Sequence, residues 1–180
     1  SFNNGNGTLI SLKEDTMENA LVSGIASQKN QVKFTLHGVG DIPGTAFKIL
    51  GPISDADVEV DVIVQNVSVD GKTDFTFTVS SEDQETVNSV IEDIKEDVEY
   101  RDLIVNSDIA KVSLVGVGMR SHAGVAATMF EALSTEGINI QLITTSEIKI
   151  TVVIDERYLE LAVRALHSAF ELDKPDLNDH

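Results

Sequence analysis

The residues best suited to chemistry lie in the loop VGDIPGTAF, residues 39–47. Gly38, Gly40 and Gly44 let the backbone approach a ligand at a helix N-terminus, where free N–H groups favour anions. The loop has no Lys-Ser/Thr pair of the Walker type, and its GxGxxxG spacing lacks the βαβ unit of a dinucleotide site. Because Asp41 adds a negative charge, the loop predicts a ligand with both charges. A free amino acid has them: a carboxylate for the helix and an ammonium for the aspartate.

Other chemistries find little support. Cysteine is absent, which excludes disulfides, thiolate catalysis and cysteine zinc sites and is typical of a reducing compartment. His122 has no second His, Asp or Glu at ligand spacing, so we expect a helix-entry or interface role and no metal site. The acidic residues of 80–99 lack the spacing and glycine of a calcium loop and predict a solvated helix face. A small enzyme would need a buried catalytic cluster, and no Ser/His/Asp or paired-carboxylate arrangement can be argued from the sequence.

Composition narrows the partners. The 180 residues carry a net charge of −17 and 13 scattered Lys and Arg residues, which argues against nucleic acid and anionic membranes. No apolar run reaches about 18 residues and no signal peptide is visible, so we expect a cytoplasmic protein. Residues 1–19, which begin SFNNGNG, predict a linker from a catalytic region, and the acidic residues 173–180 predict a C-terminal tail.

An internal repeat organises the rest of the chain. Shifting the sequence by 80 residues places Gly38 on Gly118 and Gly44 on Gly124, and brings VEVDVIVQN (58–66) onto INIQLITTS. Each copy has a β-branched strand, a glycine loop, a helix, two strands and a second helix. Strands are expected at 32–38, 58–66, 74–80 and 100–108, then at 111–118, 138–146 and 148–155, and helices at 44–57, 84–97, 124–137 and 157–170.

The order β-α-β-β-α is that of a ferredoxin-like fold, which needs one more strand. The first copy has that strand at 100–108, whereas the second copy has none after Phe170. We therefore expect the strand ALVSGIASQ, residues 20–28, to complete the second sheet. The predicted α+β protein thus has a first domain at 29–108 and a discontinuous second domain made of 20–28 plus 109–172.

These motifs resemble a known family. GVGDIPG, VDVIVQNVS, SHAGVAATMFEAL and INIQLITTSEIKI are similar, in order and spacing, to the paired ACT domains that regulate aspartate kinases, and the resemblance covers about residues 8–172. It implies that lysine, threonine or both bind between ACT domains and inhibit the phosphorylation of aspartate by ATP. In part of the family this region is also a separate beta-type regulatory subunit.

The resemblance also sets expectations for partners and cofactors. The family's kinase motif, of the type Lys-Phe-Gly-Gly-Thr-Ser, is absent from this sequence. We therefore expect no catalytic residues and no cofactor here, since ATP and Mg belong to the catalytic domain or alpha subunit. A homodimer is expected because family members pair ACT domains side by side and cover exposed sheet edges. The alternative is a stand-alone ACT module that binds amino acids or assembles another enzyme.

The effector residues implied by the resemblance fall into two groups, one for each repeat. The first group is the loop Asp41, Pro43, Gly44, Thr45 and Ala46 together with the facing-strand residues Asp61, Gln65, Asn66 and Ser68. The second group is Ser121, His122, Ala123, Gly124 and Val125 together with Asn139, Ile140, Thr145, Ser146 and Glu147. The second loop has no counterpart of Asp41, so Glu147 is the nearest candidate for holding a cationic side chain.

Overall fold

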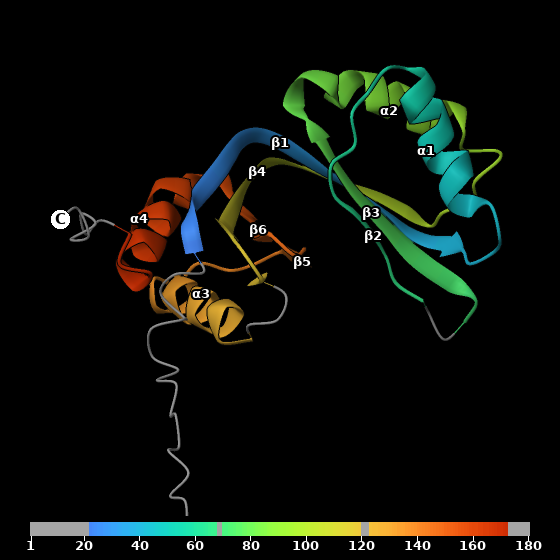
Figure 1. The fold of residues 1–180 in the computed structure, drawn as a ribbon. Helices are drawn as coiled ribbons and strands as arrows, with labels where there is room; N and C mark the ends of the chain where they lie inside the picture. Colours follow the sequence, from blue (N-terminus) through green and yellow to red (C-terminus); the bar gives the residue numbers. More distant parts are fainter. Residues whose placement is uncertain (1–21, 68–69, 120–122, 173–180) are drawn as a thin grey trace, which may run out of the picture.

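The computed structural model describes residues 22–67, 70–119 and 123–172, which form two lobes joined by two long strands (Figure 1). The elements are β1 (Val22–Gly40), α1 (Thr45–Asp55), β2 (Ile63–Gln65), β3 (Lys72–Ser80), the 3-10 helix η2 (Ser81–Asp83), α2 (Gln84–Asp93), β4 (Asp102–Gly116), α3 (Ala123–Thr135), β5 (Leu142–Thr145), β6 (Lys149–Asp155), the 3-10 helix η4 (Glu156–Tyr158) and α4 (Leu159–Ala169). Within the described residues, no helix is both long and apolar enough to cross a membrane.

All strands belong to one curled antiparallel sheet with the order β2-β3-β1-β4-β6-β5. Strands β1 and β4 pair from Val22 opposite Gly116 to His37 opposite Asp102, and they run from one lobe into the other (Figure 1). The N-terminal part of β1 therefore completes the second ferredoxin-like unit, as predicted. The domain limits themselves stay a prediction, because the two units share these strands.

The long strands differ from the sequence prediction, which separated 20–28 from 32–38 and 100–108 from 111–118. The reason lies at Asn30, where φ is 55° and the pairing register of β1 with β4 shifts. Asparagine tolerates this left-handed conformation better than most residues, so the strand bulges without ending. The Asn30 amide also donates to Glu156 Oε2 at 3.1 Å, which ties the bulge to the start of the last helical segment.

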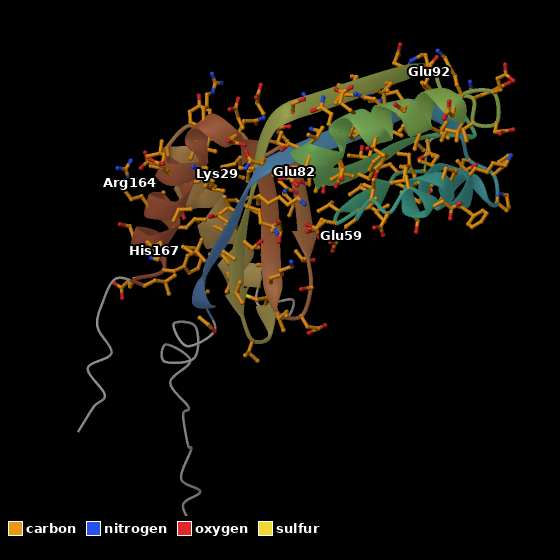
Figure 2. The ribbon with its side chains drawn as sticks, turned by 90° about the horizontal axis from the view of Figure 1, so that it is seen from above. Lys29, Glu59, Glu82, Glu92, Arg164 and His167 are labelled. Carbon is orange, nitrogen blue, oxygen red and sulfur yellow. The ribbon has the colours of Figure 1, made fainter. Side chains whose placement is uncertain are left out.

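Two separate cores follow from this arrangement. The first core lies under α1 and α2 and is centred on Phe34 and Phe77, whose rings stack with centroids 5.3 Å apart. The predicted apolar face of α2 is confirmed, because Val87 and Ile91 are fully buried. The acidic residues of the same segment point outward, as Glu82 and Glu92 show in Figure 2.

The second core lies under α3 and α4. Alternate residues of β4 and β6, such as Val112 and Val152, face it, and Leu159, Ala162 and Leu166 of α4 are buried against them. This confirms the predicted apolar face of the last helix. Each repeat therefore has its own core, while the sheet that carries both cores is continuous.

The edge strands are shorter than predicted: β2 covers three residues of the expected 58–66, and β5 covers four of the expected 138–146. In the first repeat the cause is visible. The Val62 amide donates to the hydroxyl Oγ1 of Thr78 at 3.2 Å, which interrupts regular pairing before Ile63.

Candidate functional site

The first glycine loop begins at Gly38, within the last three residues of β1, and enters α1 at Thr45. Gly38 has φ of +71°, and a Cβ built on it would lie 3.2 Å from the Cβ of Arg101. Both facts favour glycine, because a side chain here would be strained and crowded. The Asp41 amide donates to the carbonyl of Gly71, directly before β3, at 2.9 Å, and the Thr45 hydroxyl donates to the Gly40 carbonyl at 2.9 Å. The loop is therefore held both to the segment before β3 and to itself.

The start of α1 offers donors to a ligand. Gly44 occupies the N-cap with φ of +95° and supplies no side-chain cap. Within the described part of the chain, the amides of Ala46 and Phe47 donate to no acceptor. Free amides at a helix N-terminus favour a carboxylate. The Asp41 side chain is exposed on the same loop.

A cavity of about 280 Å³ opens beside this loop. Its lining carries both signs of charge, with two lysines from α1 and β3 and three acidic residues from the segment before β4: Gly38, Val39, Gly40, Ile42, Thr45, Lys48, Lys72, Glu96, Asp97, Val98 and Glu99. Such a lining suits a small zwitterion. Of the predicted effector residues, this cavity includes Thr45.

The predicted effector residues on the facing strand, at 61–68, do not lie together. Gln65 pairs with Phe75, and the Asn66 amide reaches the Asp74 carbonyl at 3.4 Å, so both lie at the glycine-loop end of β3. Asp61 lies beside Thr78, four residues from Asp74 along β3, which is about 14 Å at the usual strand rise. Its carboxylate contacts Lys111. The structure thus brings Gln65 and Asn66 toward the first loop and places Asp61 apart from it; Ser68 lies outside the described residues.

The second repeat shows the same division. Thr145, Ser146 and Glu147 lie at the end of the sheet where the second glycine loop leaves β4, since the Met119 amide donates to the Glu147 carbonyl at 3.0 Å. Asn139 and Ile140 lie at the opposite end, next to Gln141, whose amide donates to Val153. In the helix start, Gly124 is exposed and Val125 is buried. Ser121 and His122 lie outside the described residues, as does the side chain of Ala123.

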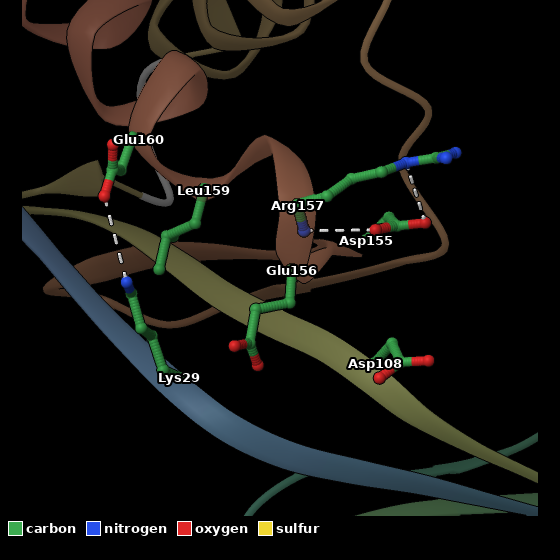
Figure 3. A pocket seen from close by; sticks show the side chains of 7 residues that line it. All are labelled: Lys29, Asp108, Asp155, Glu156, Arg157, Leu159 and Glu160. Atoms are coloured by element: carbon green, nitrogen blue, oxygen red, sulfur yellow. Dashed lines mark hydrogen bonds and ion pairs between the residues drawn. The ribbon is translucent and has the colours of Figure 1, made fainter.

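Another cavity, of about 630 Å³, lies away from both loops, at the Asn30 bulge. Four of its charged side chains pair with one another: Lys29 with Glu160 at 4.0 Å, and Arg157 with Asp155 at 3.3 Å (Figure 3). It contains none of the predicted effector residues, and its charges are largely engaged internally.

Sequence reasoning missed two polar contacts. Asp74 holds His37 and Gly38 at the loop entry, and Lys111 is a buried lysine paired with Asp61. The sequence could not predict either contact from the positions of Lys and Asp, because each contact joins segments that come together only when the register of the sheet is set.

Comparison with known proteins agrees with this architecture. Models of the ACT domain match residues 36–99 and 112–170. The aspartate kinase Ask_LysC of Stutzerimonas stutzeri (strain A1501) is 61% identical over 176 residues, which are 97% of this chain and 43% of that protein. The chain thus spans less than half the length of the curated relatives it matches.

Two solved structures match this chain over nearly their whole length. A crystal structure of aspartokinase alpha and beta subunits shares 49% identity with a TM-score of 0.78, covering 83% of this chain and 99% of that one. The ligand-free regulatory subunit of aspartate kinase from Thermus thermophilus shares 36% identity with a TM-score of 0.79 and the same coverage. With two ACT units, one continuous sheet and these relatives, the chain belongs to the family of tandem ACT-domain regulatory regions of aspartate kinases.

Proposed function

We propose that this chain is the amino-acid sensor of an aspartate kinase, with lysine, threonine or both as its effectors. The observation that carries the proposal is the first glycine loop, where the free amides of Ala46 and Phe47 lie beside a cavity lined by both signs of charge. The effector carboxylate accepts from these amides, and Asp41 holds the ammonium. The second loop takes a second effector or the same one, with Glu147 near a cationic side chain.

Regulation follows from differential binding. An effector that binds the inhibited arrangement more tightly than the active one shifts the population toward inhibition. The phosphorylation of aspartate is performed by a catalytic domain or alpha subunit, and the end products of lysine, threonine and methionine biosynthesis feed back on it. This chain supplies the binding energy, while the partner supplies the chemistry.

A homodimer completes the effector sites in this proposal. Asp61, Asn139 and Ile140 lie far from the loops within one chain, and a partner related by a two-fold axis brings such residues to the opposite loop. Ile42 and Phe47, which are 62% and 78% exposed beside the first loop, supply apolar surface for that contact.

Titration calorimetry with lysine and with threonine tests the sensor role. Binding of at least one of them, and a thermal shift that is changed by adding an aspartate kinase catalytic domain, support it. If neither amino acid binds but another one does, and the catalytic domain has no effect, the chain is an ACT module that serves a different enzyme.

A further inference from the structure

The entry of the first glycine loop is held by a single carboxylate, that of Asp74 on β3. Its Oδ1 accepts a hydrogen bond from the Gly38 amide at 3.0 Å, and its Oδ2 lies 2.9 Å from His37 Nδ1. Asp74 therefore fixes the last side chain of the regular β1 pairing and the first amide of the loop at the same time.

The opposite side of the loop entry is held by the segment that precedes β4. The Arg101 amide donates to the His37 carbonyl at 2.7 Å, and a Cβ built on Gly38 would lie 3.2 Å from the Arg101 Cβ, a crowded contact. Residues 37 and 38 are thus fixed from two sides, by β3 and by the residue that precedes β4. Gly38 and the next two residues, Val39 and Gly40, line the 280 Å³ cavity.

We propose that Asp74 is a positioning residue for the first effector site, which it keeps in its binding shape through the Gly38 amide and the His37 imidazole. This inference rests on the proposed sensor function and adds a residue that contacts no effector itself. Preorganisation is the physical reason: a loop already held in its bound shape loses less conformational entropy when the ligand arrives.

The charges around Asp74 support this role. His37 lies on β1, Arg101 precedes β4, and Arg101 Nε is paired with Asp102 Oδ2 at 2.7 Å. The Gly38 amide and the His37 hydrogen bond hold the pKa of the Asp74 carboxyl below its usual range, with a smaller contribution from Arg101. The carboxylate is therefore ionised at neutral pH and makes charge-assisted hydrogen bonds, which are the stronger kind.

The imidazole part of this contact is particular to the first repeat. Val117 takes the place of His37 in the 80-residue register. A valine side chain neither donates nor accepts a hydrogen bond, so the second loop has no counterpart of the hydrogen bond between His37 and Asp74.

The experiment compares Asp74→Ala, Asp74→Asn and the control Asp102→Asn, which removes a nearby charge that pairs with Arg101 outside the loop. Calorimetry with threonine and lysine gives affinities, and NMR hydrogen exchange gives the protection of the Gly38 amide. We expect Asp74→Ala to weaken binding at the first site about tenfold or more, the scale of one charge-assisted hydrogen bond. Asp74→Asn should lose less, since its Oδ1 still accepts from Gly38, and Asp102→Asn should bind normally.

The two readouts separate the two ideas. Faster exchange at Gly38 in Asp74→Ala, with unchanged exchange in the cores and weaker effector binding, supports the positioning role. Unchanged Gly38 exchange, or normal affinity in Asp74→Ala, overturns it. If the unaltered protein binds neither lysine nor threonine, the sensor proposal is wrong. The positioning role of Asp74 at an effector site is then also wrong, even if hydrogen exchange shows that Asp74 protects the Gly38 amide.

Discussion

Lys111 and Asp61 join the two repeats through an ion pair in which Lys111 Nζ lies 2.6 Å from Asp61 Oδ2. Lys111 lies on β4 with its side chain 2% exposed, whereas Asp61 precedes β2 and is 48% exposed. A second contact runs the other way, from Lys33 Nζ on β1 to Gln141 Oε1 at 2.7 Å. Asp61 and Gln141 occupy equivalent positions in the 80-residue register. The lobes are therefore linked reciprocally by lysines as well as by shared strands.

Replacing Asp61 with Ala should lower the free energy of unfolding by about 1–3 kcal/mol, because it leaves the buried Lys111 ammonium without its counter-charge. Lys111→Met should cost less, since an apolar side chain of similar length avoids burying a charge. Chemical denaturation measures both. Glu59→Ala is the matched control, an exposed acid two residues earlier; equal losses for Asp61→Ala and Glu59→Ala would contradict the role of the pair.

Replacing Asp41 with Ala should weaken effector binding by about 1.5–3 kcal/mol if its carboxylate holds the ammonium. Stability should barely change, because the side chain is exposed and the loop contact runs through the Asp41 amide. Calorimetry with lysine and threonine is the measurement, with Glu131→Ala on α3 as a remote control of the same charge. Unaltered affinity for both amino acids would remove Asp41 from the site.

The glycine loop and both helix faces were predictable from the sequence because their signals are local. Glycine spacing at Gly38, Gly40 and Gly44 and the helical period of Val87 and Ile91 depend on residues close in the chain. The strands were also located, but their lengths were not. Asn30 is a usual turn residue and predicts a break between two strands, whereas in the folded sheet it forms a bulge within one continuous strand. The polar contact of Val62 with Thr78 depends on neighbouring strands.

The site was predictable only in part for the same reason. The resemblance placed Asp61 and Gln65 on one facing strand, where the two-residue period of a strand puts both on the same face, and both lie on the same edge of the sheet. Their side chains nevertheless serve different ends of it, because Asp61 reaches across to Lys111. Asp74 could not be singled out from the sequence, because its contact with His37 depends on which residues of β1 and β3 lie beside each other. That register is set only in the folded sheet.

The acid stability of the protein should carry a contribution from Asp74. Its pKa is lowered in the folded state, so this contribution is fully present above the unfolded pKa of about 3.9 and is lost as pH falls through the lower folded value. Denaturation of the unaltered protein and Asp74→Asn from pH 7 to about pH 2.5 should therefore show a stability difference that shrinks below about pH 4. A difference that stays constant over this range would mean that the carboxylate charge is not stabilising.

The chain should sediment as a dimer at tens of micromolar, and effector should favour that dimer. Phe47→Asp should shift it toward the monomer, because the side chain is 78% exposed next to the first loop and a charge there opposes apolar contact. Thr86→Asp on the exposed face of α2 adds the same charge elsewhere and should sediment like the unaltered protein. A stable monomer in the presence of lysine and threonine would exclude a shared site.

The continuous strands β1 and β4 also govern how the chain acquires its structure. Residues Val22 to Gln28 of β1 pair with residues that follow more than 80 positions later, from Lys111 to Gly116. During synthesis this segment cannot pair until β4 has been made, and the second core cannot form until α4 has also been made. Such distant pairings slow folding because a long loop must close before they contribute. The first repeat is thus an insertion within the second repeat, and the second core should form only after the first repeat has been synthesised.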